Sequence, residues 1–413
     1  MERIYRYRMT TTSGGNLSVR DHSGDVWITP ARLDKGALRR EDIVCIRADG
    51  SIKGVARPSS ELPLHQEIRR RRPELIGIVH AHPVALVAFS LVHRVPDTRL
   101  FHQSYNVCGE GGFAPYRLPG SAALGEAVGE AFEQGYNCVV LENHGVVTAG
   151  ATFQEAFRRF ETFEFAAKTI IKASHLGEVR YLTDEQIAME QLRPPTAEFT
   201  RGAPTSDELE LRRQLCDFVR RAYRQRLFIS TQGTYSARLS ASSFVITPSD
   251  MDRGTLTPGD LVLIEDGRHE AGKTPSRAAR LHDAIYRRHS HIGAVVNAYP
   301  VNATAFSVTG AELDTRTIPE SYVVVRHTAR SPFGLQFESP DEVAGLLAQE
   351  RPAIVLENDG VLVAGTGILE AFDRLEVLES TAEALINCRA IGSLKPLSES
   401  VTRELDQAFF GRE

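Results

Sequence analysis

The sequence "ELIGIVHAHP" at residues 74–83 is written a second time, as "HIGAVVNAYP", at residues 291–300. The apolar residues keep their places in both copies, but the first copy alone carries His80 and His82. A short run of β-branched and small apolar residues that ends at a proline is typical of a buried strand. We therefore expect the same strand to occur twice, with a chemical role in the first copy only.

Two further blocks repeat in the same order and at a nearly constant offset. "VWITP" at 26–30 matches "FVITP" at 244–248, and "VVLENHGVVTAG" at 139–150 matches "IVLENDGVLVAG" at 354–365. Ordered matches of this kind are the sequence signature of an internal duplication. The chain is therefore predicted to hold two copies of one domain.

The boundary between the copies is marked by composition. The stretch "RPPTAEFTRGAPTSDE" is rich in Pro, Gly, Ser and Thr, which is typical of a linker. We predict a first domain over 1–180, a linker over 181–205 and a second domain over 206–413. A helical pattern over 206–225, with Ser206 as its expected N-cap, precedes the second copy, and the first copy has no room for an equivalent helix before "SGGNLS".

The overall composition is that of a globular protein without a basic or membrane-spanning segment. The 413 residues are 42% apolar and 24% charged, and the net charge is −5. Nucleic acid and anionic membranes are therefore not expected as partners. No run of roughly 18 apolar residues indicates a transmembrane helix, and the first residues lack the apolar core of a secretory signal. Five scattered cysteines suit a reducing compartment, so we expect a cytoplasmic protein.

Within each copy, predicted strands alternate with predicted helices. "SVRDHSGDVWITP" and "DIVCIRADGSI" are typical of paired short strands. "SSELPLHQEIRRRR" indicates a helix, because serines and a proline stand at its start. "TFQEAFRRFETFEFAAKTIIKASHLG" has the periodicity of a long amphipathic helix. This alternation predicts an α/β domain around a mixed sheet.

The candidate chemistry lies in the first copy. Residues i and i+2 of a strand share a face, so His80 and His82 are expected to project together. His144 stands at a strand-to-glycine turn in "ENHGVV", where side chains emerge at a sheet edge. Three imidazoles accept a divalent metal of the zinc class and leave coordination positions open for substrate. We predict a catalytic metal site formed by these three histidines.

The second copy acts as an internal control on this prediction. The three histidines are replaced there as a set, by Asn297, Tyr299 and Asp359, and Glu61 is replaced by Ala278. A carboxylate at a helix start beside a metal is well placed to move a proton, although an acid there also pairs favourably with the helix dipole. Because Glu61 disappears together with the histidines, we favour an acid/base role. His65, in contrast, is kept as His282, which suits a structural role.

Six elements of the first copy, in order, resemble the class II aldolase/adducin family, which includes fuculose-phosphate aldolase and ribulose-phosphate 4-epimerase. These elements are "SGGNLSV", "VWITP", "KGVARPSSELPLH", "VHAHP", "APYRLPGS" and "ENHG". The resemblance implies a three-layer α/β/α domain around a mixed sheet, present twice in tandem with a degenerate second copy. It also implies a homo-oligomer with sites near subunit interfaces, and we favour a homodimer that forms a pseudo-tetramer.

The resemblance also assigns candidate roles to residues. His80, His82 and His144 become metal ligands, and Glu61 becomes the acid/base. Substrate-binding candidates are Asn16, Thr29, Arg32, Ser59 and Ser60. The chain departs from many phosphosugar members after "ITP", where Ala31 and Arg32 stand at phosphate-gripping places, although a guanidinium also suits an anion. The aldolases' catalytic tyrosine has no clear match, and the candidates for its role are His102, Gln103 and Tyr105.

The function expected from these residues is that of a metal-dependent lyase. A carbon–carbon bond of a small hydroxy-carbonyl, sugar-like substrate would be cleaved, by retro-aldol reaction or decarboxylation, through an enediolate. One divalent ion per chain is expected, with zinc favoured over manganese, cobalt, nickel or iron. The alternatives are a non-haem iron oxygenase, a 4-epimerase, and a non-catalytic adducin-like binding or scaffold protein.

Overall fold

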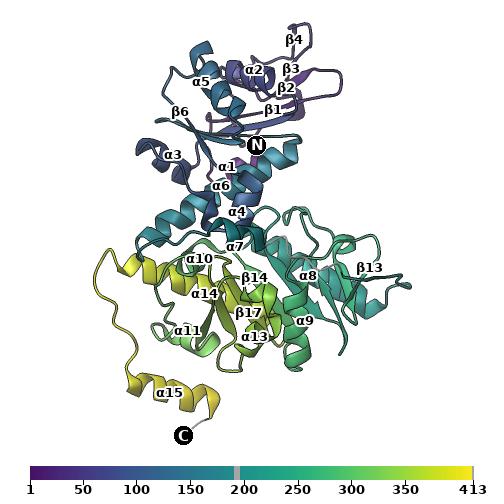
Figure 1. Ribbon diagram of the computed structural model, residues 1–413, viewed down its shortest axis with the longest axis vertical. Coiled ribbons are helices and arrows are strands. Elements are labelled where there is room, and N and C mark those ends of the chain that lie inside the picture. Colours follow the sequence, from purple (N-terminus) through teal and green to yellow (C-terminus); the bar gives the residue numbers. More distant parts are fainter. Residues whose placement is uncertain (190–195, 412–413) are drawn as a thin grey trace. The chain divides into compact units, whose positions relative to one another are not determined.

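The computed structural model describes residues 1–189 and 196–411. The chain divides into two compact units, Met1–Lys168 and Thr169–Glu413 (Figure 1). The dividing point falls inside one long helix, α6 (Phe153–Ser174). Part of the predicted linker, 190–195, lies outside the described residues. No described helix has the length and hydropathy needed to span a bilayer.

Unit 1 is built on an eight-stranded sheet with the order β4-β3-β2-β1-β5-β8-β7-β6. All neighbouring strands are antiparallel except β6 and β7, so the sheet is mixed as predicted. The strands are β1 (Asn16–Arg20), β2 (Val26–Ile28), β3 (Val44–Ile46), β4 (Ile52–Lys53), β5 (Gly77–Ala81), β6 (Gly112–Ala114), β7 (Cys138–Leu141) and β8 (Gly145–Gly150).

Helices cover both faces of this sheet and give three layers. On one face, α2 (Leu62–Arg71) and α5 (Ala122–Glu133) pack together over a core that includes Ile68, Val128 and Phe132. On the other face, α6 is tied to β8, since Thr148 donates from its hydroxyl to the Ala156 carbonyl. The remaining helical segments of the unit are α1 (Glu2–Arg6), α3 (Val84–Leu91), α4 (His102–Cys108) and the 3-10 turns η1 (Arg40–Asp42) and η2 (Thr98–Leu100).

Unit 2 repeats this architecture, and the predicted duplication is confirmed. Its sheet has the order β15-β16-β17-β14-β10-β11-β12-β13-β9, in which the first eight strands follow the order of unit 1 read from β6 to β4. The strands are β9 (Glu198–Phe199), β10 (Thr234–Arg238), β11 (Ser243–Ile246), β12 (Val262–Glu265), β13 (Arg268–Glu270), β14 (Ala294–Ala298), β15 (Thr328–Ser331), β16 (Ala353–Leu356) and β17 (Val361–Gly365).

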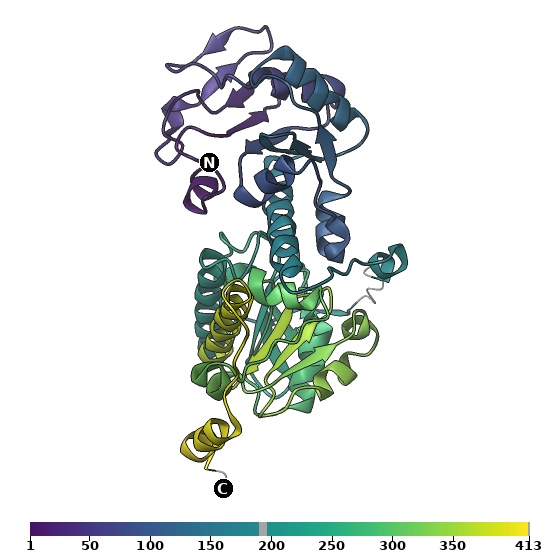
Figure 2. The same cartoon turned by 90° about the vertical axis from the view of Figure 1, so that its left-hand side faces the viewer.

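Figure 2 shows helices on both sides of the unit 2 sheet. α8 (Ser206–Arg224) and α14 (Ile368–Cys388) pack against strands β10 and β14, and α9 (Ala279–Arg288) and α13 (Pro340–Gly345) share a core with Phe244 and Ile264. The shorter helices are α7 (Asp184–Ala188), α10 (Val301–Ser307), α11 (Pro319–Val324), α12 (Leu335–Glu338), α15 (Glu399–Phe410) and the 3-10 turn η4 (Pro258–Asp260).

Two details at the start of unit 2 refine the sequence analysis. The N-cap of α8 is Thr205 and not the predicted Ser206, because the Thr205 side chain accepts the backbone N–H of Glu208. The short strand β9, inside the predicted linker, pairs with β13 and so extends the unit 2 sheet.

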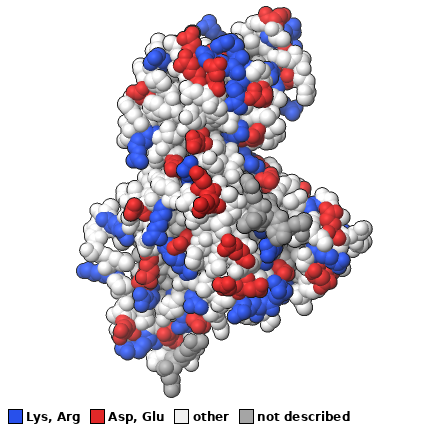
Figure 3. Space-filling model, in the orientation of Figure 1, with Lys and Arg blue, Asp and Glu red and all other residues white. Residues whose placement is uncertain are grey.

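Acidic and basic side chains are interspersed on the face shown in Figure 3, without a continuous basic surface there. The exposed arginines of α2 illustrate this pairing. Arg70 lies 2.6 Å from Glu67, and Arg71 contacts both Glu67 and Glu133. This distribution agrees with the net charge of −5.

Candidate metal centre

The sheet of unit 1 brings the three candidate histidines together at one strand end. His80 lies on β5 and His82 follows it, while β5 pairs with β8 and so adjoins the turn that carries His144. That turn depends on Asn143, whose φ of 51° lies in the left-handed region that asparagine tolerates better than most residues. Its counterpart Asn358 has a φ of 48°, so the turn is common to both units.

The three imidazole rings converge on one point. Their centroids lie 4.9 to 5.0 Å apart, and one nitrogen of each ring lies within 4.8 Å of the others. His80 is fully buried, and its Nδ1 lies 2.9 Å from the carbonyl oxygen of Val146. With Nδ1 engaged by this carbonyl, Nε2 is the nitrogen that faces the other rings, and Glu61 outweighs the effect of burial and raises the pKa of His80.

Glu61 completes the cluster as the residue that precedes helix α2. Its carboxylate oxygens lie 3.0 Å from His80 Nε2 and 3.2 Å from His144 Nε2. Burial alone would raise the pKa of Glu61, but His80 and His144 outweigh burial and lower it, so the carboxyl is ionised. Burial, together with the neighbouring imidazoles, lowers the pKa of His82 to about 3, so this ring is neutral at pH 7.

A buried hydrogen-bond chain holds Glu61 from behind. Asn16, which faces His80 across the β1–β5 pair, donates from Nδ2 to Glu61 Oε2 at 2.7 Å, and its Oδ1 contacts His65. His65 Nδ1 lies 2.6 Å from the Ser18 hydroxyl, which also accepts a hydrogen bond from Arg69. Asn16, predicted to bind substrate, thus contacts both Glu61 and His65, and His65 is fully buried within this chain of hydrogen bonds.

The other substrate-binding candidates lie around the start of α2 and along β2. Ser59 is buried, and its hydroxyl accepts the backbone N–H of Glu61 at 3.3 Å, whereas Ser60 is exposed. The Thr29 hydroxyl accepts the backbone N–H of Leu17 at 3.0 Å, which ties β2 to β1. Arg32 is exposed and has a φ of 57°.

The structure does not gather the two candidate catalytic residues of α4 into the imidazole cluster. Among the described residues, the converging metal-type group consists of His80, His82 and His144. His102 is fully buried on α4, and Tyr105 is half-buried with the Arg99 guanidinium 5.9 Å from its ring centroid.

Residues that the sequence analysis missed also shape this site. A Cβ on Gly145 would come within 2.6 Å of the Ala81 carbonyl oxygen and 2.7 Å of His82 Cδ2, and one on Gly14 would lie 3.0 Å from His82 Nδ1. Glu142 accepts the backbone N–H of Tyr116 at 2.7 Å and so anchors the "APYRLPGS" loop beside the turn of His144. The glycines of "SGGN" and "ENHG" were the sequence features that could have indicated this close packing around His82.

Unit 2 fills the equivalent place with its own side chains. Tyr299 donates its hydroxyl hydrogen to Asp359 Oδ1 at 2.7 Å, and Gln336 donates to the other carboxylate oxygen at 3.0 Å. Arg277, which stands at the position of Ser60, lies 3.6 Å from the same carboxylate. A guanidinium thus supplies the positive charge beside Asp359, and Asn297 accepts from the retained His282 at 2.7 Å.

Comparison with known proteins gives one family for both units. The model of the "Class II Aldolase and Adducin N-terminal domain" matches residues 1–171 and again 213–386. An L-fuculose phosphate aldolase of Methanococcus vannielii is 33% identical over 171 residues, which cover 40% of this chain and 88% of the relative. A 3-oxo-tetronate 4-phosphate decarboxylase of Haemophilus influenzae is 30% identical over 188 residues, 45% of this chain and 89% of the relative.

A solved structure described as L-fuculose 1-phosphate aldolase is similar to part of the chain. It has 28% sequence identity and a TM-score of 0.41, and the match covers 45% of this chain and 88% of that protein.

Proposed function

This chain belongs to the class II aldolase and adducin family, and on that premise we propose that its first unit is a metal-dependent lyase. The reaction is cleavage of a carbon–carbon bond, by retro-aldol reaction or decarboxylation, in a small hydroxy-carbonyl, sugar-like substrate. Relatives named as sugar-phosphate aldolases and as a decarboxylase support this reaction class. The observation that carries the proposal is the convergence of His80, His82 and His144 on the ionised Glu61.

The donor set fits one divalent ion per chain, with zinc as the favoured metal. Three imidazole nitrogens within 4.8 Å of one another are typical zinc-class donors and leave positions for substrate oxygens. The buried Glu61 Oε1 faces His144 Nε2 at 3.2 Å but accepts no well-aligned hydrogen bond among the described residues, which suits a site that a cation completes. When bound, the ion supplies Lewis-acid polarisation of the substrate's carbonyl oxygen. In unit 2, Arg277 and Asp359 leave no equivalent role for a metal.

Glu61 is proposed as the group that moves the proton. Its two oxygens are in different environments, because Asn16 donates to Oε2 whereas Oε1 lies 3.2 Å from His144 Nε2. An ionised carboxylate beside the three imidazoles can accept a proton from a substrate hydroxyl and return it to carbon. Asn16 is a positioning residue in this scheme, since it fixes the carboxylate and is itself held by His65. Ser59, Ser60, Thr29 and Arg32 remain candidates for substrate binding, and His102 and Tyr105 for the catalytic acid.

The wider assignments are proposals of the same kind. The functional domains are 1–180 and 206–413, the assembly is a homo-oligomer, and the partner is a small-molecule substrate. All five cysteines are free, which supports a reducing, cytoplasmic compartment.

The test compares His144→Ala with Asp359→Ala, substitutions at the same turn of the two units. Purified full-length protein is analysed for bound metal and assayed with phosphorylated and unphosphorylated hydroxy-carbonyl compounds. The proposal expects about one ion per chain and cleavage activity, both lost in His144→Ala and both kept in Asp359→Ala. Oxidation of a substrate with Fe(II) and oxygen, without cleavage, would instead identify an oxygenase, and a metal-free inactive chain would identify a scaffold.

A further inference from the structure

In unit 2, helix α8 covers the β10–β11 part of the sheet face on which α14 lies, whereas no helix among the described residues covers the equivalent β1–β2 part in unit 1, which we call the bare face. In unit 2, helix α8 packs on β10, β11 and η4. Beneath it, Val245, Leu256 and Leu261 are at most 1% exposed. At the same places of the "VWITP" and "DKGALRRED" segments, unit 1 has Trp27, Leu38 and Ile43. Trp27 is 41% exposed and the other two are half-buried.

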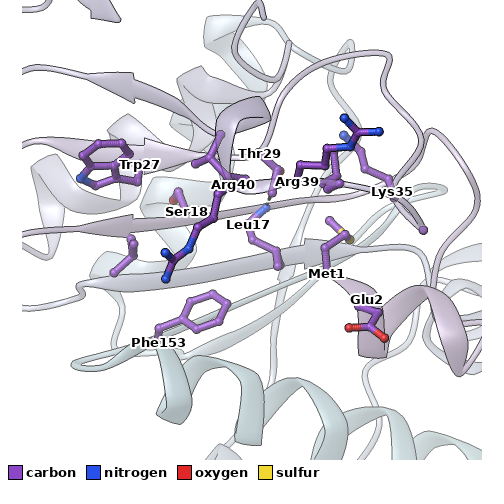
Figure 4. Close-up of a pocket in the computed structure, with 14 residues that line it drawn as sticks. Met1, Glu2, Leu17, Ser18, Trp27, Thr29, Lys35, Arg39, Arg40 and Phe153 are labelled. Atoms are coloured by element: carbon purple, nitrogen blue, oxygen red, sulfur yellow. Dashed lines mark hydrogen bonds between the residues drawn. The ribbon is translucent and has the colours of Figure 1, made fainter. Parts of the chain in front are cut away.

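The bare face contains a cavity of about 420 Å³. Figure 4 shows Leu17, Trp27 and Phe153 among its lining side chains, with Arg39 and Arg40 beside them. An apolar cavity of this size, at a place that a helix covers in the duplicate domain, is typical of a surface that binds another structural element, and we call this surface the seat.

Helix α1 is the counterpart of only the last turns of α8. Arg3 lies over the Phe157 ring at 5.8 Å, as Arg221 lies over Phe372 at 4.7 Å. After the helix, Arg8 and its counterpart Arg226 both have a positive φ, 55° and 64°. The described part of unit 1 holds no counterpart of 206–218, which is the part of α8 that would lie over the cavity.

We propose that this face of unit 1 binds helix α15 from a second copy of the chain. When residues are counted from the N-cap, α15 has apolar side chains at the positions that α8 buries. In α8, capped by Thr205, the buried positions over this stretch are Glu208, Arg212, Leu215 and Cys216. In α15, capped by Ser398, the same positions are all apolar: Val401, Leu405, Ala408 and Phe409. α15 has 12 residues, close to the length of the missing stretch.

The apolar stripe of α15, formed by the four residues named above, is not buried in unit 2 and is available for binding. The helix buries no residue in its own unit, and Phe409 is 61% exposed. It contacts unit 2 through Asp406, which lies 2.6 Å from Arg326 and accepts from the Tyr322 hydroxyl at 3.2 Å, and through Phe410 over the same guanidinium. A cavity of about 540 Å³ lies beside Phe409 and Phe410, so the packing there is incomplete.

The surface of α15 and the seat carry opposite charges. α15 carries Glu399, Glu404 and Asp406 against one arginine, Arg403. The seat carries the exposed Arg39 and Arg40 among its lining residues, and its lining acid, Glu2, is paired with Arg6. Opposite charges of this kind steer a helix to its groove and favour one partner over others.

The register of α8 predicts a contact that can be tested by cross-linking. Cys216 donates to the Leu256 carbonyl at 3.1 Å in unit 2, so Phe409 of the second copy should lie beside Leu38. Full-length chains with Leu38→Cys and Phe409→Cys, each also Cys388→Ser and differently tagged, are mixed and mildly oxidised. We expect a cross-link between the two tags in at least about tenfold higher yield than with Arg403→Cys, an exposed position opposite the stripe. Equal yields or no cross-link would overturn the proposal, and so would a chain that carries both cysteines and links only to itself.

A second variant uses the chain's own helix as a competitor. Residues 206–218 of α8 are joined ahead of Met1 so that they continue into α1 and cover the cavity. This extension should abolish the cross-link between copies, whereas the same extension with its Leu215→Asp change should not. If the cross-link survives the intact extension, the helix binds elsewhere and the proposal is wrong. Neither readout depends on bound metal or lyase activity.

Discussion

The hydroxyl of Tyr299 donates to Asp359 across 2.7 Å, and these two residues occupy the places that His82 and His144 occupy in the first unit. The same backbone therefore holds two different sets of side chains. Unit 1 has three imidazoles beside a carboxylate, and unit 2 has a carboxylate, Asp359, beside Tyr299 and Arg277. The substitutions in unit 2 are coordinated, since Arg277 supplies a positive charge to the same carboxylate. This pairing explains why the histidines were replaced as a set.

Removal of the Tyr299 hydroxyl should destabilise unit 2. Tyr299→Phe leaves a buried oxygen of Asp359 without its hydrogen-bond donor, which typically costs about 1–3 kcal/mol of unfolding free energy. Hydrogen exchange of β14 and β17 would report the loss. Tyr116→Phe is the control. That side chain is 52% exposed, so loss of its hydroxyl group should not change the exchange rates. An unchanged exchange rate in Tyr299→Phe would show that the pair contributes little.

Glu61→Gln should separate chemistry from metal binding. The amide keeps the shape of the side chain but cannot accept a proton, so turnover should fall by about 10²–10⁴-fold. The histidine ligands are unaltered, so the chain should still bind metal. Steady-state kinetics and metal analysis on the same preparation check both parts. Activity within a few-fold of the wild type would exclude Glu61 as the acid/base.

Gly145→Ala should disturb the metal site through packing alone. The added methyl group would meet the Ala81 carbonyl at 2.6 Å and the His82 ring at 2.7 Å, so the ring has to move. We expect metal affinity to fall by about tenfold or more, as for other changes that misorient a ligand. Gly392→Ala is the control, because a Cβ there meets no atom within 4 Å. Competition with a chromogenic chelator measures the affinity, and equal values would contradict the close approach.

The stability of unit 2 should depend on the protonation of Glu379. Burial raises the pKa of this carboxyl to about 7, although it accepts hydrogen bonds from Asn302 and Ala303 at the start of α10. Because the folded-state pKa lies above the unfolded one, this group's stabilising contribution is complete below about pH 4.5 and is lost as pH rises through 7.

Hydrogen exchange of α10 between pH 5 and 8, corrected for the intrinsic rate, measures this contribution. Protection should fall with rising pH, by up to about 1.4 kcal/mol per pH unit. Glu379→Gln should flatten the profile, whereas the exposed Glu399→Gln should leave it unchanged. A wild-type profile without this slope would show that Glu379 is not protonated in the folded state.

Much of the architecture could be predicted because the same strand and helix patterns occur in both copies of the repeat. Strand patterns around residues 26–30 and 139–150 recur with the same alternation in the second copy, so the mixed sheet and its helices followed from periodicity. The i, i+2 spacing of His80 and His82 likewise placed both rings at one strand end. No sequence pattern shows that the Asn16 amide donates to Glu61 at the start of helix α2, so this contact was not anticipated.

Contacts between distant residues set the limit of the sequence analysis. The role of Gly145 rests on a close approach to β5, which only the folded sheet creates. The positive charge that Arg277 brings to Asp359 was missed, because its counterpart Ser60 gives no hint of a cation. The bare face beside Trp27 was likewise visible only when the burial of the two units could be compared.

The central claim is that unit 1 holds a divalent ion between three imidazoles and that unit 2 does not. Anomalous diffraction from crystals grown with zinc, recorded on both sides of the zinc edge, tests it directly. The account predicts one strong peak per chain, within bonding distance of His80, His82 and His144. An empty cluster, or an equal peak beside Tyr299 and Asp359, would contradict it.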